Sequence, residues 1–334
     1  PSLGLNLAPK TRYDWTVSVT SFSKEMDCTE TASNSSWFET GCMSENWMAN
    51  WIEPDQIPTE PSKKLSLDEM GAILHGKKEK FQSRDYHEFQ PAQYLRLPFA
   101  IDEKIKKARV YASAHGVYRL LLNGRRVDDR EFAPEFTAYD NFLMYQTYDT
   151  SDHLIAGNNV IGVVLADGWW IGRLGMFGEC CQYGSTLGLI LQVEIEYIDG
   201  RKDIICSDQM RSSLGPIRYS DIFVGERYDA NFEISGWSEP NFSDAAWLPV
   251  TVKNYSKFNL VGQLGEPVRA IRRFKPATIL FTPKNEMVID LGQVIAGRME
   301  IHINAPAGTE IKLEHSEVLE ENGNFLNNIQ GFNK

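Results

Sequence analysis

Two adjacent tryptophans, Trp169 and Trp170, have the position in this sequence that most favours ligand binding. They follow the apolar run 160–165, whose density of β-branched residues is typical of a buried strand, and residues 167–168 and Gly172 break that strand on either side of the rings. Such a loop can stack against the C–H face of a flat, hydroxyl-bearing ligand such as a sugar. The alternative is that both rings pack in the core of a β-protein.

Strand alternation predicts which of the two rings is exposed. If the strand continues to residue 170 without a bulge at Gly168, Leu165 and Trp169 lie on one face and Trp170 on the other. We therefore expect Trp169 in the core if Leu165 points inward, and Trp170 as the exposed ring.

The composition indicates an ordinary globular protein and excludes some partners. With 334 residues, 42% of them hydrophobic and 24% charged, the chain is long enough for two or three domains. A formal charge of −11 argues against nucleic acid, because phosphate binding needs concentrated Lys and Arg. No stretch has the roughly 18 consecutive apolar residues that a membrane helix requires, so we expect no membrane as a partner.

The cysteines do not indicate a metal site or a compartment. Cys28, Cys42, Cys180, Cys181 and Cys206 form no CxxC pair and have no histidine at zinc spacing. An odd count leaves at least one thiol unpaired within the chain. Cys28 and Cys42 could close a small loop, whereas adjacent Cys180 and Cys181 are expected to be separate thiols because a vicinal disulfide is strained.

Strand patterns bounded by turn residues predict an all-β protein of consecutive antiparallel β-sandwich or jelly-roll domains, with one short helix in the central module. Residues 1–44 are typical of the closing part of a fibronectin-III-like β-sandwich, with strands at 11–21 and 36–41 and a polar loop between them. Residues 45–255 are predicted to form a jelly roll. Residues 256–334 are predicted to begin a second β-sandwich, which we expect to be incomplete.

Local signals mark the turns and the helix. Asn123-Gly124 and Asp199-Gly200 are hairpin dipeptides that tolerate left-handed backbone. The helix is predicted over 65–80, with Ser66 as N-cap and Glu69 three residues later. In the third module, strand patterns lie at 277–281, 287–291, 299–303 and 310–317.

The order of motifs resembles the non-catalytic amino-terminal half of bacterial α-L-rhamnosidases of glycoside hydrolase family 78. The blocks that carry the resemblance are RLLLNG at 119–124, YQTYD at 145–149, ADGWWIG at 166–172, GERYDA at 225–230, IDLGQ at 289–293, AG at 296–297, PAGT at 306–309 and EVL at 317–319. Each block alone is weak, but their order over about 290 residues is specific. The family usually has Asn where this sequence has Val294, which puts a polar role there in doubt.

The resemblance implies a parent enzyme that hydrolyses terminal α-L-rhamnose from glycosides or polysaccharides with inversion. The acid and base of such enzymes lie in an (α/α)6 barrel that follows these β-domains. We expect this chain to lack the barrel and to be inactive alone, and therefore assign no catalytic residue; Glu226 and Glu317 are interpreted as structural. The barrel is the expected intramolecular partner. Export to the periplasm or the exterior is also expected.

The resemblance also suggests a ligand. Some members have, at the position of 96–252, a family 67 carbohydrate-binding module that binds terminal L-rhamnose through calcium with an Asp-Asn pair. Asp140 and Asn141 match that pair, and their carboxylate and amide oxygens are ligands that calcium accepts. The alternative is a simple turn, which both residue types favour.

Two further residues are candidates for the same site. Glu179 and Tyr183 could hydrogen-bond sugar hydroxyls, and Tyr183 also offers a ring for stacking. Alternatively, Tyr183 only begins the next strand. A purely structural role of all the β-domains, with no sugar contact, is the competing hypothesis.

Overall fold

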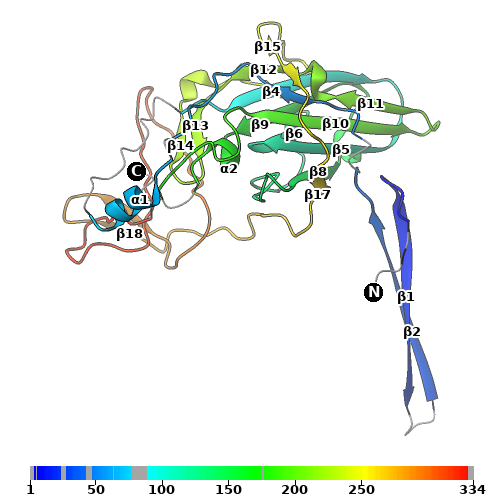
Figure 1. The fold of residues 1–334 in the computed structure, drawn as a ribbon, viewed down its shortest axis with the longest axis horizontal. Coiled ribbons are helices and arrows are strands. Elements are labelled where there is room, and N and C mark those ends of the chain that lie inside the picture. Colours follow the sequence, from blue (N-terminus) through cyan, green and yellow to red (C-terminus); the bar gives the residue numbers. More distant parts are fainter. Residues whose placement is uncertain are drawn as a thin grey trace.

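A β-sandwich forms the body of the protein, and a long two-stranded ribbon projects from it (Figure 1). The computed structural model describes residues 4, 6–23, 28–42, 47–62, 64–76, 89–174 and 177–329. Strands dominate and nearly all pairs are antiparallel, so the predicted all-β class is confirmed.

The sandwich consists of two facing sheets. The seven-stranded sheet has the order β16 (Thr251–Lys253), β3 (Trp51–Glu53), β10 (Gly188–Tyr197), β5 (Ile105–His115), β8 (Leu143–Asp149) and β17 (Leu260–Gly262), with β11 (Lys202–Cys206) also paired to β10. The six-stranded sheet has the order β15 (Leu248–Pro249), β12 (Arg211–Leu214), β4 (Gln93–Ile101), β9 (Gly157–Ala166), β6 (Val117–Leu122) and β7 (Arg125–Arg126). Among the strand pairs of the described ranges, only β17 runs parallel to its neighbour.

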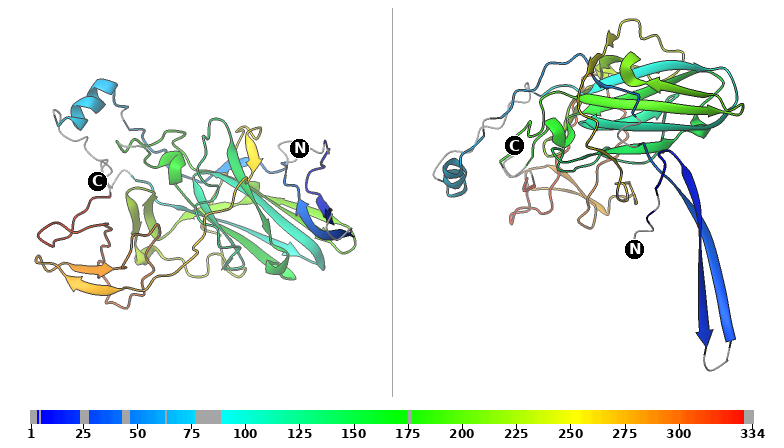
Figure 2. Two further views of the ribbon diagram at one scale, coloured as in Figure 1. Left: turned by 90° about the horizontal axis from the view of Figure 1, so that it is seen from below. Right: turned by 45° about the vertical axis from the view of Figure 1, so that its right-hand side comes forward.

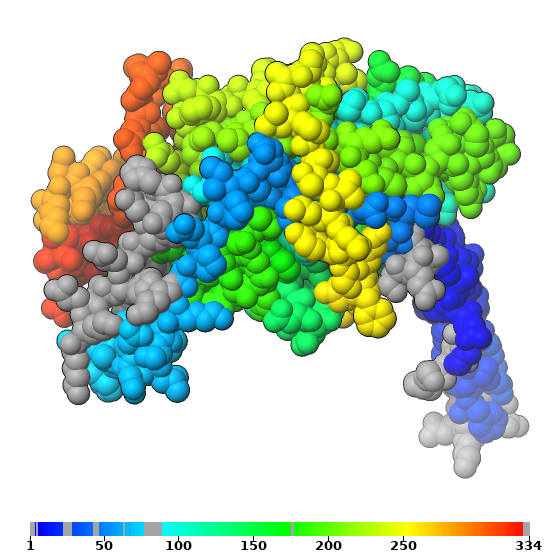
Figure 3. Space-filling model, turned by 45° about the horizontal axis from the view of Figure 1, so that its top comes forward, coloured from blue at the N-terminus to red at the C-terminus, as the bar shows by residue number. Residues whose placement is uncertain are grey.

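The core lies between the sheets because alternate residues of each strand point inward. Leu189, Leu191 and Val193 of β10 and Val163 and Leu165 of β9 are all buried in one cluster. Burying each such side chain contributes about 1.5–3 kcal/mol. A second cluster on the outer face of the seven-stranded sheet is covered by the segment that precedes β3 and by β17, which extends the module beyond residue 255. Figure 3 shows the segment that contains β16, in yellow, beside the blue segment that contains β3.

The predicted turns and helix cap are confirmed. Asn123 and Gly124 have φ angles of 50° and 81° between β6 and β7. Helix α1 spans Leu67–Leu74, and the Ser66 side chain accepts from the Glu69 amide while the Glu69 carboxylate accepts from the Ser66 amide. The helix ends earlier than expected because Gly76 turns the chain with a φ of 65°; residues 77–80 lie outside the described part. The described ranges also contain the single-turn helix α2 (Gly168–Ile171) and short 3-10 helices at Ser151–His153, Ser207–Gln209 and Ala230–Phe232.

The amino-terminal ribbon consists of β1 (Arg12–Ser23) and β2 (Cys28–Glu39), paired along twelve residues (Figure 2). The prediction of a polar loop before residue 36 was wrong, because the Ser and Thr residues of this segment belong to β2 and pair with β1. Trp15, Val17 and Val19 remain 44–62% exposed on one face. The ribbon is joined to the sandwich by an ion pair of Glu39 with Arg109, at 3.0 Å. Its membership in a larger sandwich stays a prediction.

The carboxyl-terminal section contains less sheet than expected. The strands predicted at 277–281 and 287–291 are formed as β18 (Thr278–Phe281) and β19 (Met287–Asp290), which pair as a hairpin. A further hairpin, β13 (Ile217–Asp221) with β14 (Gly225–Tyr228), precedes it. The predicted strands at 299–303 and 310–317 are not formed, since neither segment pairs with a strand in the described chain. Their alternating apolar residues are correspondingly exposed. No helix in the described ranges has the length and apolar character that crossing a membrane requires.

Candidate functional site

The tryptophan pair lies on a helical turn at one end of the sandwich. β9 ends at Ala166, and α2 begins at Gly168, whose φ is 53°. A Cβ at Gly168 would lie 2.5 Å from Val117 Cγ1, so the chain turns here only with glycine. Strand alternation therefore does not apply to Trp169 and Trp170, and both rings are half-buried.

Trp170 is held in a column of stacked rings. Its indole is parallel to the His115 imidazole, with centroids 3.9 Å apart and planes within 1°. Trp51 stacks on the opposite face of His115 at 4.1 Å. This contact with the end of β5 packs Trp170 against the core, but its ring stays half-buried, as that of Trp169 does, so the expectation that Trp170 is the exposed ring of the pair stays a prediction. Its other neighbours are Tyr139, at 5.6 Å, and Tyr183, at 6.1 Å.

The column is electrically neutral at neutral pH. Burial lowers the pKa of His115 to about 4, and the negative charge of Glu53 only partly opposes that shift. Glu53 accepts hydrogen bonds from Thr186 Oγ1, at 2.8 Å, and from the Tyr255 hydroxyl, and pairs with Lys253 at 3.0 Å. Burial acts to raise the pKa of Glu53, but these partners together outweigh it and lower that pKa.

Trp169 contacts two phenylalanines that sequence reasoning did not identify. The Phe132 and Phe136 rings each lie 5.7 Å from Trp169, and they are 44% and 47% exposed. A signal was available in the sequence, since two aromatic residues flank a proline four positions apart in Phe-Ala-Pro-Glu-Phe. The exposed aromatic surface at this end therefore surrounds Trp169 rather than Trp170.

Asp140 and Asn141 are exposed on a turn beside the ring column. The Asn141 amide donates to the Ala138 carbonyl at 2.8 Å, as the turn interpretation expects. Between this turn and the column lies Tyr139, whose ring is 4.9 Å from that of Tyr183. The structure thus brings Asp140, Asn141 and Tyr183 to the same end of the sandwich as Trp170.

The turn does not by itself make a calcium site. Asp140 and Asn141 offer two oxygen donors of the right chemistry, whereas calcium takes about six to eight. No group of three or more His, Cys, Asp and Glu side chains converges as a metal cluster within the described ranges. Most of the coordination shell would therefore come from outside these two side chains.

Glu179 has structural partners. Its carboxylate accepts from the Leu65 amide at 3.3 Å and from Gln182 Nε2 at 3.0 Å, which ties the loop to the segment before α1. In the same loop the sulfurs of Cys180 and Cys181 are 3.8 Å apart, so these are separate thiols as predicted. The side chain of Cys28 lies outside the described part, and its pairing with Cys42 stays untested.

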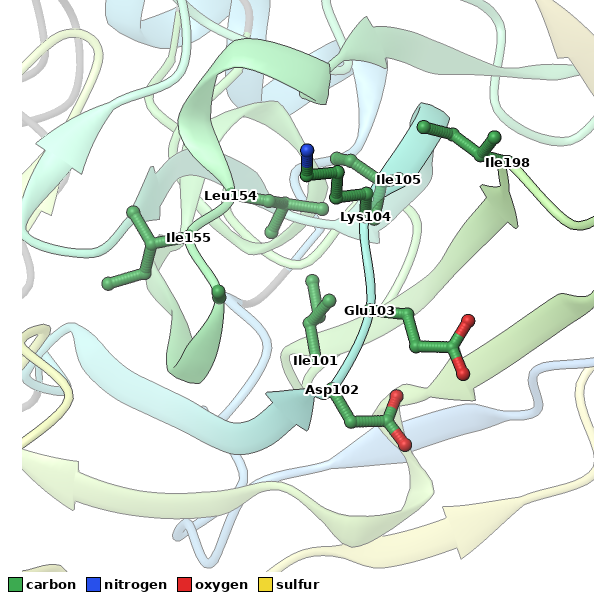
Figure 4. Close-up of a pocket in the computed structure, with 9 residues that line it drawn as sticks. Ile101, Asp102, Glu103, Lys104, Ile105, Leu154, Ile155 and Ile198 are labelled. Atoms are coloured by element: carbon green, nitrogen blue, oxygen red, sulfur yellow. The ribbon is translucent and has the colours of Figure 1, made fainter.

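A separate hollow of about 400 Å³ lies at the opposite end of the sandwich. Figure 4 shows the aliphatic side chains of Ile101, Ile105 and Leu154 around it, with the Asp102 and Glu103 carboxylates at its edge. It contains none of the predicted site residues, so the candidate site is an aromatic surface separate from this hollow.

Comparison with known proteins identifies the family. Residues 103–272, just over half of the chain, match the model of the α-L-rhamnosidase N-terminal domain. The chain belongs to the α-L-rhamnosidase family. Residues 281–331 match the bacterial α-L-rhamnosidase concanavalin-like domain, so the resemblance inferred from the motif blocks is confirmed.

The curated α-L-rhamnosidases align with most of this chain. An α-L-rhamnosidase of Streptomyces avermitilis is 36% identical over 283 residues, which are 82% of this chain and 27% of that protein. One of Formosa agariphila is 26% identical over 326 residues, 96% of this chain and 33% of that protein. The chain thus spans about a quarter to a third of the curated relatives that it matches.

Solved structures of the same family share the fold. The Streptomyces avermitilis α-L-rhamnosidase complexed with L-rhamnose superposes with a TM-score of 0.80 at 25% identity, covering 98% of this chain and 45% of that one. The Aspergillus terreus enzyme gives a TM-score of 0.71 at 30% identity, covering 85% of this chain and 30% of that one.

Proposed function

We propose that this chain is the accessory β-sandwich portion of an α-L-rhamnosidase that releases terminal α-L-rhamnose from glycosides or polysaccharides. The aromatic end of the sandwich, defined by Tyr139, Asp140, Asn141, Trp170 and Tyr183, would bind the sugar. The observation that carries this proposal is the meeting of three rings beside an exposed carboxylate and amide. A pyranose needs this combination, because its C–H face stacks on rings while its hydroxyls require polar partners.

The geometry assigns different roles to these residues. Tyr183 offers the half-buried ring at the outer end of the column, and Trp170 supports it from the core side. Because Trp170 is already fixed against His115, it loses little conformational freedom on binding. The Asp140 carboxylate can accept hydrogen bonds from the sugar hydroxyls, and the Asn141 amide can both accept and donate them.

Binding is tested by calorimetric titration of L-rhamnose, with calcium and with a chelator. Tyr183→Ala and Asp140→Ala should each weaken binding, Tyr183→Ala by about 2- to 10-fold from the lost ring contact. Asp102→Ala, which removes an exposed carboxylate at the opposite end, is the matched control and should bind as the unmodified chain does. Absence of binding in both conditions contradicts the proposal.

Catalysis is proposed to occur outside this chain, in a helical barrel of the full-length enzyme that the sandwich supports. Glu226 and Glu317, the carboxylates in the family-like blocks, are both solvent-exposed. Incubation with an aryl α-L-rhamnoside should release no phenol; sustained turnover would show that the acid and base lie within residues 1–334. Export belongs to the same proposal, because a polymeric substrate does not enter the cell.

Scaffolding without sugar contact is the second candidate function. It is favoured by Glu179, whose carboxylate is engaged by Leu65 and Gln182. A contact between modules also supports it, since Arg298 of the carboxyl-terminal section pairs with Glu131 of the sandwich. The same titration decides, because a scaffold binds no L-rhamnose with or without calcium.

A further inference from the structure

An aromatic patch lies directly beside the proposed sugar site and has no role in it. The patch consists of Phe132, Phe136 and Trp169, with ring centroids 5.7 Å apart in both contacts to Trp169. It adjoins the aromatic end through Phe136, whose ring lies 5.8 Å from that of Tyr139. Nearly half of each phenylalanine is exposed, which is costly for large apolar side chains and marks a binding surface when they are grouped.

The two phenylalanines are held outward by a buried anchor between them. Ala133 and Pro134 are buried. The Ala133 carbonyl accepts from the Tyr118 amide at 2.7 Å, and the Pro134 carbonyl accepts from Gln146 Nε2 at 3.3 Å. The middle of the loop is therefore part of the core, and the flanking rings cannot turn inward without breaking these bonds.

The backbone on both sides of the anchor is strained. Phe132 and Glu135 have φ angles of 59° and 73°, a region that residues other than glycine rarely occupy. Glu135 is fixed there by a hydrogen bond from Gln263 Nε2 to its carboxylate, at 2.8 Å, from the chain that leaves the sandwich. Strain of this kind persists where surrounding contacts enforce it and is concentrated at ligand-binding loops.

We propose that this patch binds an aromatic group that the glycoside carries next to its terminal L-rhamnose. The proposal rests on the proposed function, since it places the sugar at the adjoining aromatic end. Phenylalanine rings have no polar atoms, so these two side chains offer a second sugar no hydrogen bonds that would fix its hydroxyls in one orientation. A planar aromatic group has no such requirement and stacks on three preformed rings at little conformational cost.

The test compares three probes by calorimetry: methyl α-L-rhamnoside, 4-nitrophenyl α-L-rhamnoside and 4-nitrophenol. The nitrophenyl glycoside should bind at least about fivefold more tightly than the methyl glycoside. A double variant, Phe132→Ala with Phe136→Ala, should remove that difference and leave binding of the methyl glycoside unchanged. Phe22→Ala is the matched control, because it removes an exposed phenylalanine from the distant ribbon and should alter neither affinity (Figure 1).

The outcomes separate this inference from the function on which it rests. Equal affinity for the two glycosides overturns the aromatic subsite while leaving sugar binding intact. Binding of 4-nitrophenol alone, abolished in the double variant, supports the patch even if no sugar binds and the proposed function fails. If the double variant loses affinity for both glycosides by the same factor, the inference is overturned, because the two rings would then only support the loop. Phe136→Tyr keeps the ring and should retain the nitrophenyl preference.

Discussion

Acidification should destabilise the sandwich through His115, which lies between the indoles of Trp51 and Trp170. Its pKa is lowered to about 4 in the folded protein, from 6.5 when it is free in water. The unfolded chain therefore binds the additional proton first as the pH falls. The stability that this neutral imidazole provides is fully present above pH 6.5 and is lost as the pH falls toward 4.

The magnitude follows from the two pKa values. A shift of one unit corresponds to about 1.4 kcal/mol, so the full loss below pH 4 is about 3 kcal/mol, and by pH 5 about 2 kcal/mol is already lost. Glu53 is the charged group that acts on this imidazole, and its attraction for the imidazolium is already included in that pKa. A loss of 2 kcal/mol is a large part of the stability of a single domain.

The assay is urea unfolding at several pH values between 7.5 and 5, followed by tryptophan fluorescence, for the unmodified chain and for His115→Phe. Phenylalanine keeps a flat ring in the column but cannot take up a proton. The free-energy difference between the two chains should change by about 2 kcal/mol over this pH range, in favour of the variant at low pH. If the difference in unfolding free energy between the two chains does not vary with pH, the conclusion that His115 is buried in its neutral form is refuted.

Three further substitutions probe the packing around the site and the sandwich. Gly184→Ala should destabilise the fold by about 1–3 kcal/mol and alter the near-ultraviolet circular dichroism of Trp170, because the new Cβ would lie 2.3 Å from its Nε1. Arg96→Ala should cost about 3 kcal/mol in urea unfolding, since this buried guanidinium pairs with Asp244 at 2.9 Å. Ser66→Ala removes the cap of α1 and should increase amide exchange in that helix, by about 0.5–2 kcal/mol of local stability, while leaving global unfolding unchanged.

Features that depend on neighbouring residues were predictable from the sequence. The cap at Ser66 and the turn at Asn123-Gly124 follow from side-chain and backbone preferences within four residues. The order of the motif blocks identified the α-L-rhamnosidase family, because a family preserves such blocks along the chain. Strand patterns also indicated the β-rich body over 45–255, but they overestimated pairing at 299–303, where the pattern is present and the partner strand is not within the described chain.

The candidate site was predicted as a location and not as an arrangement. Asp140 and Tyr183 were expected near the tryptophans, and the structure places them at that end of the sandwich. The argument for Trp170 as the exposed ring assumed a straight strand through Gly168, whereas the chain turns into a helix there and leaves both rings half-buried. His115 was not identified, because nothing near it in the sequence shows that it stacks on Trp170. The spacing of Phe132 and Phe136 offered a signal, but it does not show that they contact Trp169.

The sequence by itself thus determined the β-class, the turns, the helix cap and the family, all of which are encoded in short-range patterns or in motif order. Only the tertiary structure decided which rings contact one another. Trp170 stacks on His115, which lies 55 positions earlier at the end of another strand, whereas Trp169 contacts Phe132 and Phe136 at the surface. Stacking depends on how the two sheets bring strand ends together, and periodicity within one strand contains no information on that meeting.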